Sequence, residues 1–320
     1  MKKLVKILIV VFLVSVSLTG CQTKKVKICV TNYAIEYLVK EIGGNFVDVC
    51  NISDNSEILK SQIKADYKKI LEGTDLLLTV GKSEPYLSVY QDEINALDIN
   101  VVDVVTQVPF YNFKRYKEVV NLGNISTIED NFYDYTNFPK IDMFAVNPYV
   151  WLDPIAMTSI GSFIYNFLSS KYPLEESFFN ERFHKVEKDL AILDSELQLV
   201  RTYTNKVSFV SITPTFSVWE KPYGVTTYPI ILSKYGAVPN ASQIDLMVKT
   251  IKDAGVKYII KENGFDDEYN RLYQKIKEMA NLKEINLYNL GYITKGNMEN
   301  GDNYLTMMYS NLDALVSMTK

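Results

Sequence analysis

Two kinds of hydrophobic pattern alternate along the chain: short runs of consecutive apolar residues, and longer segments whose apolar residues recur every three or four positions. The short runs predict buried strands of a parallel sheet, and the longer segments predict amphipathic helices that cover it. The alternation therefore indicates an α/β fold with helices on both faces of parallel sheets. The predicted strands span residues 26–31, 46–52, 75–80, 100–108, 207–212, 256–262 and 284–290. The predicted helices span residues 32–42, 57–71, 154–170, 243–254, 267–280 and 303–316.

The longest periodic stretch follows Pro173 and predicts a single amphipathic helix of about thirty residues. A helix of that length can join two α/β lobes, so we expect a first lobe at 26–172, a connecting helix at 173–205 and a second lobe at 206–320. Residues 109–149 are aromatic and rich in asparagine without periodicity, and they predict a long surface excursion with local packing of its rings. The apolar positions of the long helix are Phe179, Phe183, Val186, Leu190, Leu193, Leu197 and Val200.

The first twenty residues have the three regions of an export signal. Three lysines precede an apolar run at 7–18, which is too short to span a bilayer comfortably, and Leu18-Thr19-Gly20-Cys21 follows directly. This tetrapeptide resembles the bacterial lipobox, which implies cleavage before Cys21 and attachment of two acyl chains to it. Two acyl chains suffice for stable anchoring to a membrane. We therefore expect a lipidated linker at 21–25 and a protein tethered to the outer face of the cytoplasmic membrane.

The net charge and the hydropathy of the chain limit the kinds of partner that it can bind. The chain has 34 basic and 38 acidic residues, a net charge of −4. Loss of the signal segment, with its three lysines and no acid, makes the balance more acidic still. An acidic exported protein is a poor candidate for nucleic-acid binding. No second apolar run approaches the length of a membrane span, so contact with the membrane is expected only through the lipid.

Two further cysteines, Cys29 and Cys50, lie in the first two predicted strands. They could pair, but adjacent parallel strands rarely give good disulfide geometry, so two buried thiols are the expectation.

Motifs for catalysis are missing from the sequence. Gly81-Lys82-Ser83 ends an apolar strand, but a phosphate-binding loop needs a glycine where this chain has Leu76. There is neither a Gly-x-Ser-x-Gly elbow nor a His-Glu-x-x-His motif. The only histidine, His184, lies beside the apolar stripe of the long helix, where we expect a surface or boundary position. We therefore expect neither an enzyme nor a cofactor.

Five segments carry a resemblance to a known family. Asn147-Pro148-Tyr149-Val150-Trp151-Leu152-Asp153-Pro154 and the segment from Gly301 to Leu312 resemble two motifs of the zinc/manganese-type (cluster A-I) substrate-binding lipoproteins of bacterial ABC importers. Weaker matches lie at 41–45, 83–87 and 255–259. The resemblance implies two α/β lobes on a long backbone helix, an ABC permease as partner, and a monomer that carries its substrate in the cleft between the lobes.

The same resemblance places the family's metal ligands on residues that are not metal ligands. The two histidines fall on Ile58 and Tyr149, the third ligand on Thr213, and the aspartate on Tyr292. Zinc prefers imidazole or thiolate, and manganese prefers imidazole with carboxylates, so these four side chains offer little to either ion. The usual metal site is therefore expected to be lost.

Three alternatives for the function follow. The first is a non-metal small ligand or a metal chelate in the cleft, since aromatic walls with hydroxyls suit such molecules. Against it stands the equally open alternative that the tyrosines only fill the space of the lost metal and hold the lobes together. The second is a divalent ion held by shifted carboxylates, which favour a hard ion such as calcium or magnesium. The third is an adhesin or envelope protein without transport. The first uses Tyr149, Tyr292, Thr213, Ile58, Trp219 and Glu262, with Tyr223 farther out; the second uses Asp54, Glu57 and Glu262.

Overall fold

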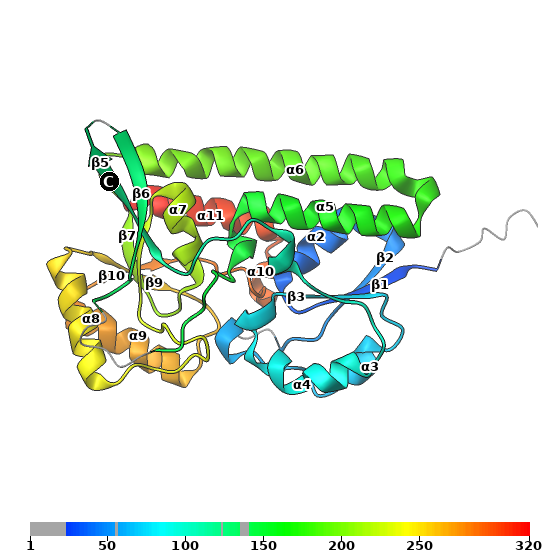
Figure 1. Ribbon diagram of the computed structural model, residues 1–320, viewed down its shortest axis with the longest axis horizontal. Coiled ribbons are helices and arrows are strands. Elements are labelled where there is room, and N and C mark those ends of the chain that lie inside the picture. The colour runs from blue at the N-terminus through cyan, green and yellow to red at the C-terminus, as the bar shows by residue number, and fades with distance from the viewer. Residues whose placement is uncertain (1–23, 55–56, 123, 135–140) are drawn as a thin grey trace, which may run out of the picture.

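The computed structural model describes residues 24–54, 57–122, 124–134 and 141–320. Two lobes lie side by side, each built on a four-stranded parallel sheet (Figure 1). The predicted signal segment, Cys21 and the start of the linker lie outside the described residues. Within the described residues, no helix combines the length and apolar character needed to cross a bilayer.

The first lobe has the sheet order β2-β1-β3-β4. Helix α2 packs on one face of this sheet together with the long helices, while α3 and α4 lie on the opposite side (Figure 1). The strands are β1 (Val26–Val30), β2 (Val47–Asn51), β3 (Leu76–Thr79) and β4 (Val101–Asp103). The helices are α2 (Tyr33–Gly43), α3 (Tyr67–Leu71) and α4 (Pro85–Asn95).

The second lobe has the sheet order β10-β9-β7-β8. Its strands are β7 (Ser208–Ser211), β8 (Thr226–Pro229), β9 (Tyr258–Lys261) and β10 (Lys283–Asn286). Its helices are α7 (Glu220–Tyr223), α8 (Ala241–Asp253), α9 (Asp267–Ala280), α10 (Lys295–Glu299) and α11 (Tyr304–Ser317). The α/β architecture with two parallel sheets is confirmed.

Two long helices lie on one side of the molecule, one along the first lobe and the other along both lobes (Figure 1). They are α5 (Pro154–Lys171) and α6 (Glu176–Gln198), which pack against each other. Asp153 begins α5 by accepting a hydrogen bond from the backbone N–H of Ile155, with Pro154 in the first turn. All seven apolar positions predicted for the long helix are buried, six of them in α6 and Val200 just after it. At 1.5 Å per residue α6 is roughly 35 Å long, enough to reach both lobes.

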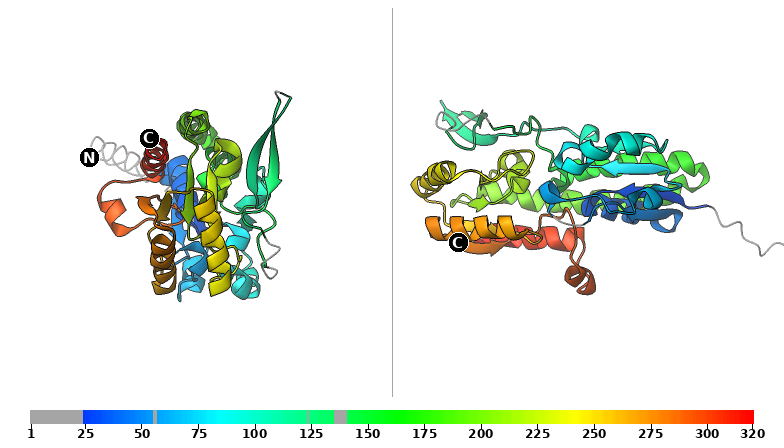
Figure 2. Two further views of the ribbon diagram at one scale, coloured as in Figure 1. Left: turned by 90° about the vertical axis from the view of Figure 1, so that its left-hand side faces the viewer. Right: turned by 90° about the horizontal axis from the view of Figure 1, so that it is seen from below.

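The excursion predicted at 109–149 contains an antiparallel hairpin that the sequence pattern did not predict. Its strands are β5 (Arg115–Asn121) and β6 (Asn124–Asp130), and it stands out at the side of the second lobe (Figure 2). Arg115 and Glu220 fasten it: the guanidinium donates to the Thr227 carbonyl, and the Glu220 carboxylate accepts from the Tyr116 N–H at 2.9 Å. The expected local packing of rings is present, since the rings of Phe113 and Phe132 are buried 5.1 Å apart.

The helix predicted at 57–71 is wrong. The segment forms a short 3-10 turn (Ile58–Lys60), then an extended bridge of Ile63 to Ser53, and only then α3. The Ser61 hydroxyl donates to the Ile58 carbonyl at 2.7 Å, so a side chain takes the acceptor that a continuing helix would use. The fourth predicted strand is likewise shorter, because the Asp103 carboxylate accepts from the Val105 N–H and begins a 3-10 turn. Helix α4 and strand β8 were not predicted.

The expectation of two buried thiols is also wrong, because Cys29 and Cys50 form a disulfide. The two residues are directly opposite each other in the β1–β2 register, with Cα atoms 4.4 Å apart. That separation lies at the short end of the range that a disulfide bridges. The bond therefore joins neighbouring parallel strands in the first lobe.

Candidate functional site between the lobes

The segment that carries the strongest motif, residues 147–154, forms the joint between the lobes. The Trp151 indole N–H donates to the Asn289 carbonyl at 2.8 Å, and the Tyr304 hydroxyl donates to the Trp151 carbonyl at 2.9 Å. From the other side, the Trp219 indole donates to the Leu152 carbonyl at 2.8 Å. All three aromatic side chains are fully buried. The motif thus holds the second lobe against the start of α5.

Glu57 lies at this joint, on the first lobe, directly before the 3-10 turn at 58–60. One carboxylate oxygen, Oε2, accepts from the Leu59 N–H at 2.9 Å and caps the turn. The other oxygen, Oε1, is buried without a hydrogen-bond partner among the described residues. Burial, followed by the charge of Glu262, raises the pKa of Glu57 to about 8. Glu57 is therefore a buried acid whose pKa is raised further by the charge of a second buried acid, Glu262, on the opposite lobe.

Glu262 follows β9 at the carboxyl end of the second sheet. Its carboxylate accepts from the Thr213 hydroxyl at 3.1 Å and from the Asn289 amide at 3.4 Å. Only 1% of the residue is exposed, and burial raises its pKa to about 7. Two neutral donors offset part of the cost of burying this acid, but no cation among the described residues pairs with it in a salt bridge.

Two tyrosine hydroxyls complete the polar cluster. Tyr149 and Tyr292 each bury a hydroxyl that has no hydrogen-bond partner within the described part of the chain. Burial raises the pKa of both, and the charges of Glu57 and Glu262 raise both further. The Tyr292 hydroxyl lies over Gly264, where a Cβ would come within 2.2 Å of it. Three oxygens without partners, one of them a carboxylate oxygen, thus gather where the lobes meet.

A small cavity lies beside the cluster and not within it. It measures about 10 Å³, which is close to the volume that one water molecule needs, and its lining includes Asn289 and Tyr292 but neither Glu57 nor Glu262. Residues of the described part of the chain form no group of three or more His, Cys, Asp and Glu side chains suited to a metal ion. Any ion at this place would take two carboxylates and, beyond them, hydroxyl and amide oxygens.

The remaining predicted site residues lie apart from this cluster or are already engaged. Ile58 is buried in the turn beside Glu57. The Trp219 side chain packs on Phe216, with ring centroids 5.1 Å apart, and its N–H is used in the joint. Tyr223 donates to Asp194 on α6 at 2.9 Å. Asp54 is exposed and accepts from the Gln62 N–H at 3.1 Å. His184 is exposed too, beside Glu187 at 2.8 Å.

Two residues of the cluster were missed from the sequence. Asn289 comes just after β10, at the edge of a parallel sheet where ligands commonly bind, and this position was the available signal. Asn32 follows β1 at the matching edge of the first sheet. Its Oδ1 accepts from the Ala34 N–H, while its Nδ2 is buried without a partner among the described residues.

A model of the family described as ZnuA, zinc-uptake complex component A, periplasmic, matches residues 28–318. The chain belongs to this family. The resemblance read from the sequence is thereby confirmed. Members of the ZnuA family are solute-binding components of ABC importers and not enzymes, which agrees with the lack of catalytic motifs.

Individual relatives of the ZnuA family are distant. The zinc-binding protein AdcA of Streptococcus pyogenes is 28% identical over 171 residues, which cover 53% of this chain and 33% of AdcA. The zinc-binding lipoprotein AdcA of Streptococcus pneumoniae is 25% identical over 173 residues, 54% of this chain and 34% of the relative. The match thus spans about a third of the length of these curated relatives.

Solved structures share the fold along nearly the whole chain. A crystal structure of ZnuA superimposes with a TM-score of 0.71 at 14% identity and covers 93% of this chain and 100% of its own. The laminin-binding protein Lmb of Streptococcus agalactiae, described as an adhesin with metal-transporting activity, gives 0.71 at 17% identity, with 92% and 100% covered. At these identities the likeness concerns the fold alone.

Proposed function

We propose that this chain is the solute-binding component of an ABC importer and that it carries a divalent cation between its lobes. The observation that supports this proposal is the pair of buried acids, Glu57 and Glu262, which come from opposite lobes. Two carboxylates balance the charge of one divalent ion. A buried acid without a counter-charge is costly, and a bound cation would remove that cost.

The partnerless oxygens fit the same cargo. Glu57 Oε1 and the hydroxyl oxygens of Tyr149 and Tyr292 have no hydrogen-bond partner among the described residues, and each of these oxygens has lone pairs that a cation could use. The Thr213 hydroxyl and the Asn289 amide already contact Glu262, so each has an oxygen near the cluster. Such an all-oxygen set suits a hard ion such as manganese, magnesium or calcium better than zinc, which prefers nitrogen and sulfur ligands. The cargo of this chain would therefore differ from the zinc named for AdcA.

The organic ligand that we predicted for this cleft finds no support. The aromatic side chains at the joint are packed against one another: the Tyr149 ring lies 5.4 Å from the Trp151 ring. The small cavity of about 10 Å³ beside Tyr292 and Asn289 is too small for an organic molecule. Adhesion rests only on the fold shared with laminin-binding proteins, and no feature of the residues that the structure describes favours it.

We propose in addition where the protein is located and where its domains begin and end. Residues 1–20 would direct export, Cys21 would carry the lipid, and the linker 21–25 would tether the lobes outside the cytoplasmic membrane. The AdcA relative named a lipoprotein supports this placement. A first lobe at 26–172, a connecting helix at 173–205 and a second lobe at 206–320 would act as a monomer that delivers the ion to an ABC permease.

The test is calorimetric titration of the metal-free protein, from residue 24 onward, with Mn²⁺, Mg²⁺, Ca²⁺ and Zn²⁺. We expect one ion per chain, a hard ion preferred over zinc, and a loss of at least about tenfold in affinity for Glu57→Gln and for Glu262→Gln. Glu220→Gln is the matched control, since Glu220 is a buried acid with a pKa raised to about 7 in the hairpin anchor. Absence of binding by all four ions, or wild-type affinity in both variants, would refute the proposal.

A further inference from the structure

A polar contact outside the cluster joins the two lobes close to Glu57. The Lys60 ammonium, at the end of the 3-10 turn of the first lobe, donates to Glu268 Oε2 at 2.9 Å. It lies 3.9 Å from Asp266 Oδ2 and 4.8 Å from the centroid of the Tyr269 ring. These three partners lie at the start of α9 in the second lobe. One lysine of the first lobe therefore contacts three side chains of the second, through charge and through the ring quadrupole.

The partners of Lys60 are held in place by the second lobe itself. Asp266 caps α9, because its carboxylate accepts from the Tyr269 N–H at 2.8 Å. Glu268 lies in the first turn of α9, where the helix dipole favours negative charge. The Tyr269 side chain is fully buried, and its hydroxyl donates to the Gly236 carbonyl at 3.0 Å. The groups that receive the ammonium are thus positioned without help from Lys60.

The turn that carries Lys60 also carries Glu57, one of the two proposed carboxylate ligands. The Lys60 N–H donates to the Glu57 carbonyl at 2.9 Å, and the Glu57 carboxylate accepts from the Leu59 N–H at 2.9 Å. Leu59 is buried against Gly236 of the second lobe, where a Cβ would lie 3.4 Å from the Leu59 Cβ. Because these two hydrogen bonds hold a short turn together, Lys60 and Glu57 move as one unit.

The contact at Lys60 is more exposed to water than the aromatic joint between the same two lobes. The side chains of Lys60 and Glu268 are 30% and 51% exposed. The side chains of Trp151, Trp219 and Tyr304 are fully buried. Water can therefore replace the partners of Lys60 directly, but it reaches the hydrogen bonds of the joint only after the rings have separated. We expect the lobes to part first at Lys60.

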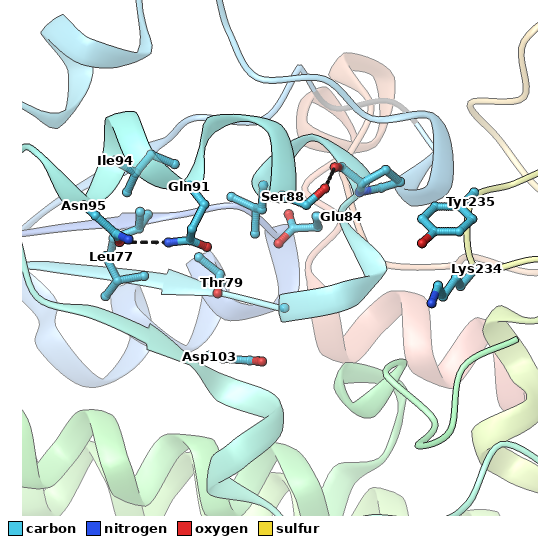
Figure 3. A pocket seen from close by; sticks show the side chains of 14 residues that line it. Leu77, Thr79, Glu84, Ser88, Gln91, Ile94, Asn95, Asp103, Lys234 and Tyr235 are labelled. Carbon is cyan, nitrogen blue, oxygen red and sulfur yellow. Dashed lines mark hydrogen bonds between the residues drawn. The ribbon is translucent and has the colours of Figure 1, made fainter. Parts of the chain in front are cut away.

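A cavity of the first lobe leaves space for movement next to this contact. It measures about 560 Å³ and lies over the carboxyl ends of β3 and β4, with Lys234 and Tyr235 of the second lobe at one end (Figure 3). Both of these side chains are engaged: the Lys234 ammonium forms a salt bridge with Asp142 at 2.9 Å and lies 5.0 Å from the centroid of the Tyr235 ring. The next residue is Gly236, against which Leu59 packs. The loop that contacts Leu59 therefore borders free space and not only packed side chains.

We propose that Lys60 is a latch for the cation site. Its contacts with α9 hold the turn at 57–60 against the second lobe and keep the Glu57 carboxylate close to that lobe. When these contacts break, the turn moves away together with Glu57, and the ion can enter or leave. Lys60 is a positioning residue, because its own charge repels a cation. The inference rests on the proposed function, in which Glu57 and Glu262 bind a divalent ion from opposite lobes.

The test measures ion affinity by calorimetry and ion release by stopped-flow mixing with excess chelator, on the protein from residue 24 onward. The ion is whichever of Mn²⁺, Mg²⁺ and Ca²⁺ binds the wild type most tightly. We expect Lys60→Gln and Glu268→Gln each to weaken binding and to speed release by about twofold to fivefold, the range of a partly exposed ion pair. The double variant should bind about as well as the single ones, because all three lose the same contact. Lys60→Arg keeps the charge and should stay close to the wild type.

Charge alone predicts a different pattern from a latch. Removing a positive charge near a bound cation strengthens binding, so an affinity of Lys60→Gln equal to or above that of the wild type would overturn the latch. Additive losses from Lys60→Gln and Glu268→Gln would overturn it as well. Lys64→Gln is the matched control: Lys64 donates to the Asn51 carbonyl within the first lobe at 2.8 Å, so its replacement should not speed release. A wild type that binds none of the ions would instead overturn the proposed function, and the latch with it.

Discussion

The indole nitrogen of Trp151 and the carbonyl oxygen of Asn289 lie 2.8 Å apart, in a hydrogen bond that joins the two lobes. The side chain of the same Asn289 donates to Glu262 at 3.4 Å. One asparagine therefore takes part in the joint through its backbone and in the proposed cation site through its amide. We therefore expect a change that weakens the joint to lower the affinity of the site for a metal ion.

Replacing Trp151 by Phe tests this connection. The change leaves the buried Asn289 carbonyl without its donor, so we expect the free energy of unfolding to fall by about 1–3 kcal/mol. We also expect weaker metal binding, because Asn289 loses its fixed position beside Glu262. Trp219→Phe is the control: it removes the bond to the Leu152 carbonyl at similar cost in stability but touches no proposed ligand. Both variants are measured by denaturant unfolding and by metal titration. Equal metal affinities in the two variants would show that the hydrogen bond of the joint does not influence metal binding at the site.

For the tyrosine hydroxyls without hydrogen-bond partners we predict the opposite effect on stability, a gain on removal. Tyr149→Phe and Tyr292→Phe each remove a buried oxygen without a partner, so the metal-free protein should become more stable, by about 1 kcal/mol. The same changes should weaken metal binding. Tyr304→Phe is the matched control, because its hydroxyl donates to the Trp151 carbonyl and its loss should destabilise the protein. If Tyr149→Phe and Tyr292→Phe destabilise as much as the control does, the two hydroxyls have partners in solution.

The disulfide should contribute measurably to stability. Cys29 and Cys50 are separated by 21 positions, and closing a loop of this length stabilises by about 3 kcal/mol in the chain-entropy account. We therefore expect Cys29→Ser with Cys50→Ser to lower the denaturant midpoint, and a reductant to lower it in the wild type alone. Thiol labelling of the unfolded, non-reduced protein from residue 24 onward should find no free thiol. Two labelled thiols would show that the pair is reduced.

Glu84 should make stability depend on pH. Burial raises its pKa from an ordinary value near 4.5 to about 7, so between these values the native state keeps a proton that the unfolded chain releases. The contribution is fully present below pH 4.5 and is lost as the pH rises through 7. We expect the free energy of unfolding to fall over this window, and Glu84→Gln to remove part of the slope. Urea unfolding from pH 4.5 to 8 measures it, and parallel curves for variant and wild type would contradict the assignment.

Local patterns predicted the parts of the fold that local sequence controls. Consecutive apolar residues such as those at 76–78 marked the buried strands, and spacings of three and four from Phe179 to Val200 marked the long helix. The prediction failed where a single side chain redirected the backbone. Ser61 ended the turn after Glu57, and Asp103 ended the fourth strand, each through one hydrogen bond that a periodicity does not record.

The site was only partly predictable for a different reason. Motif matching located Tyr149, and the carboxylates Glu57 and Glu262 stood among the alternatives because oxygen ligands suit a hard ion. Asn289 reaches Glu262 only after β10 has paired with β9, so its place near the end of a strand could be predicted from the sequence but its partner could not. The Cys29–Cys50 bond depends likewise on the register between two strands, which the sequence does not specify.

The long helix α6 has a consequence for how the chain folds. Near its start Phe179 packs on Phe46 of the first lobe, and toward its end Asp194 accepts from Tyr223 of the second. One contiguous hydrophobic cluster extends through both lobes and includes the apolar face of α6, while the first lobe has a second, smaller cluster on the side of α3 and α4. The main core of each lobe is therefore continuous with that helix. The two lobes should therefore melt together in a single cooperative transition, and neither should fold when expressed alone.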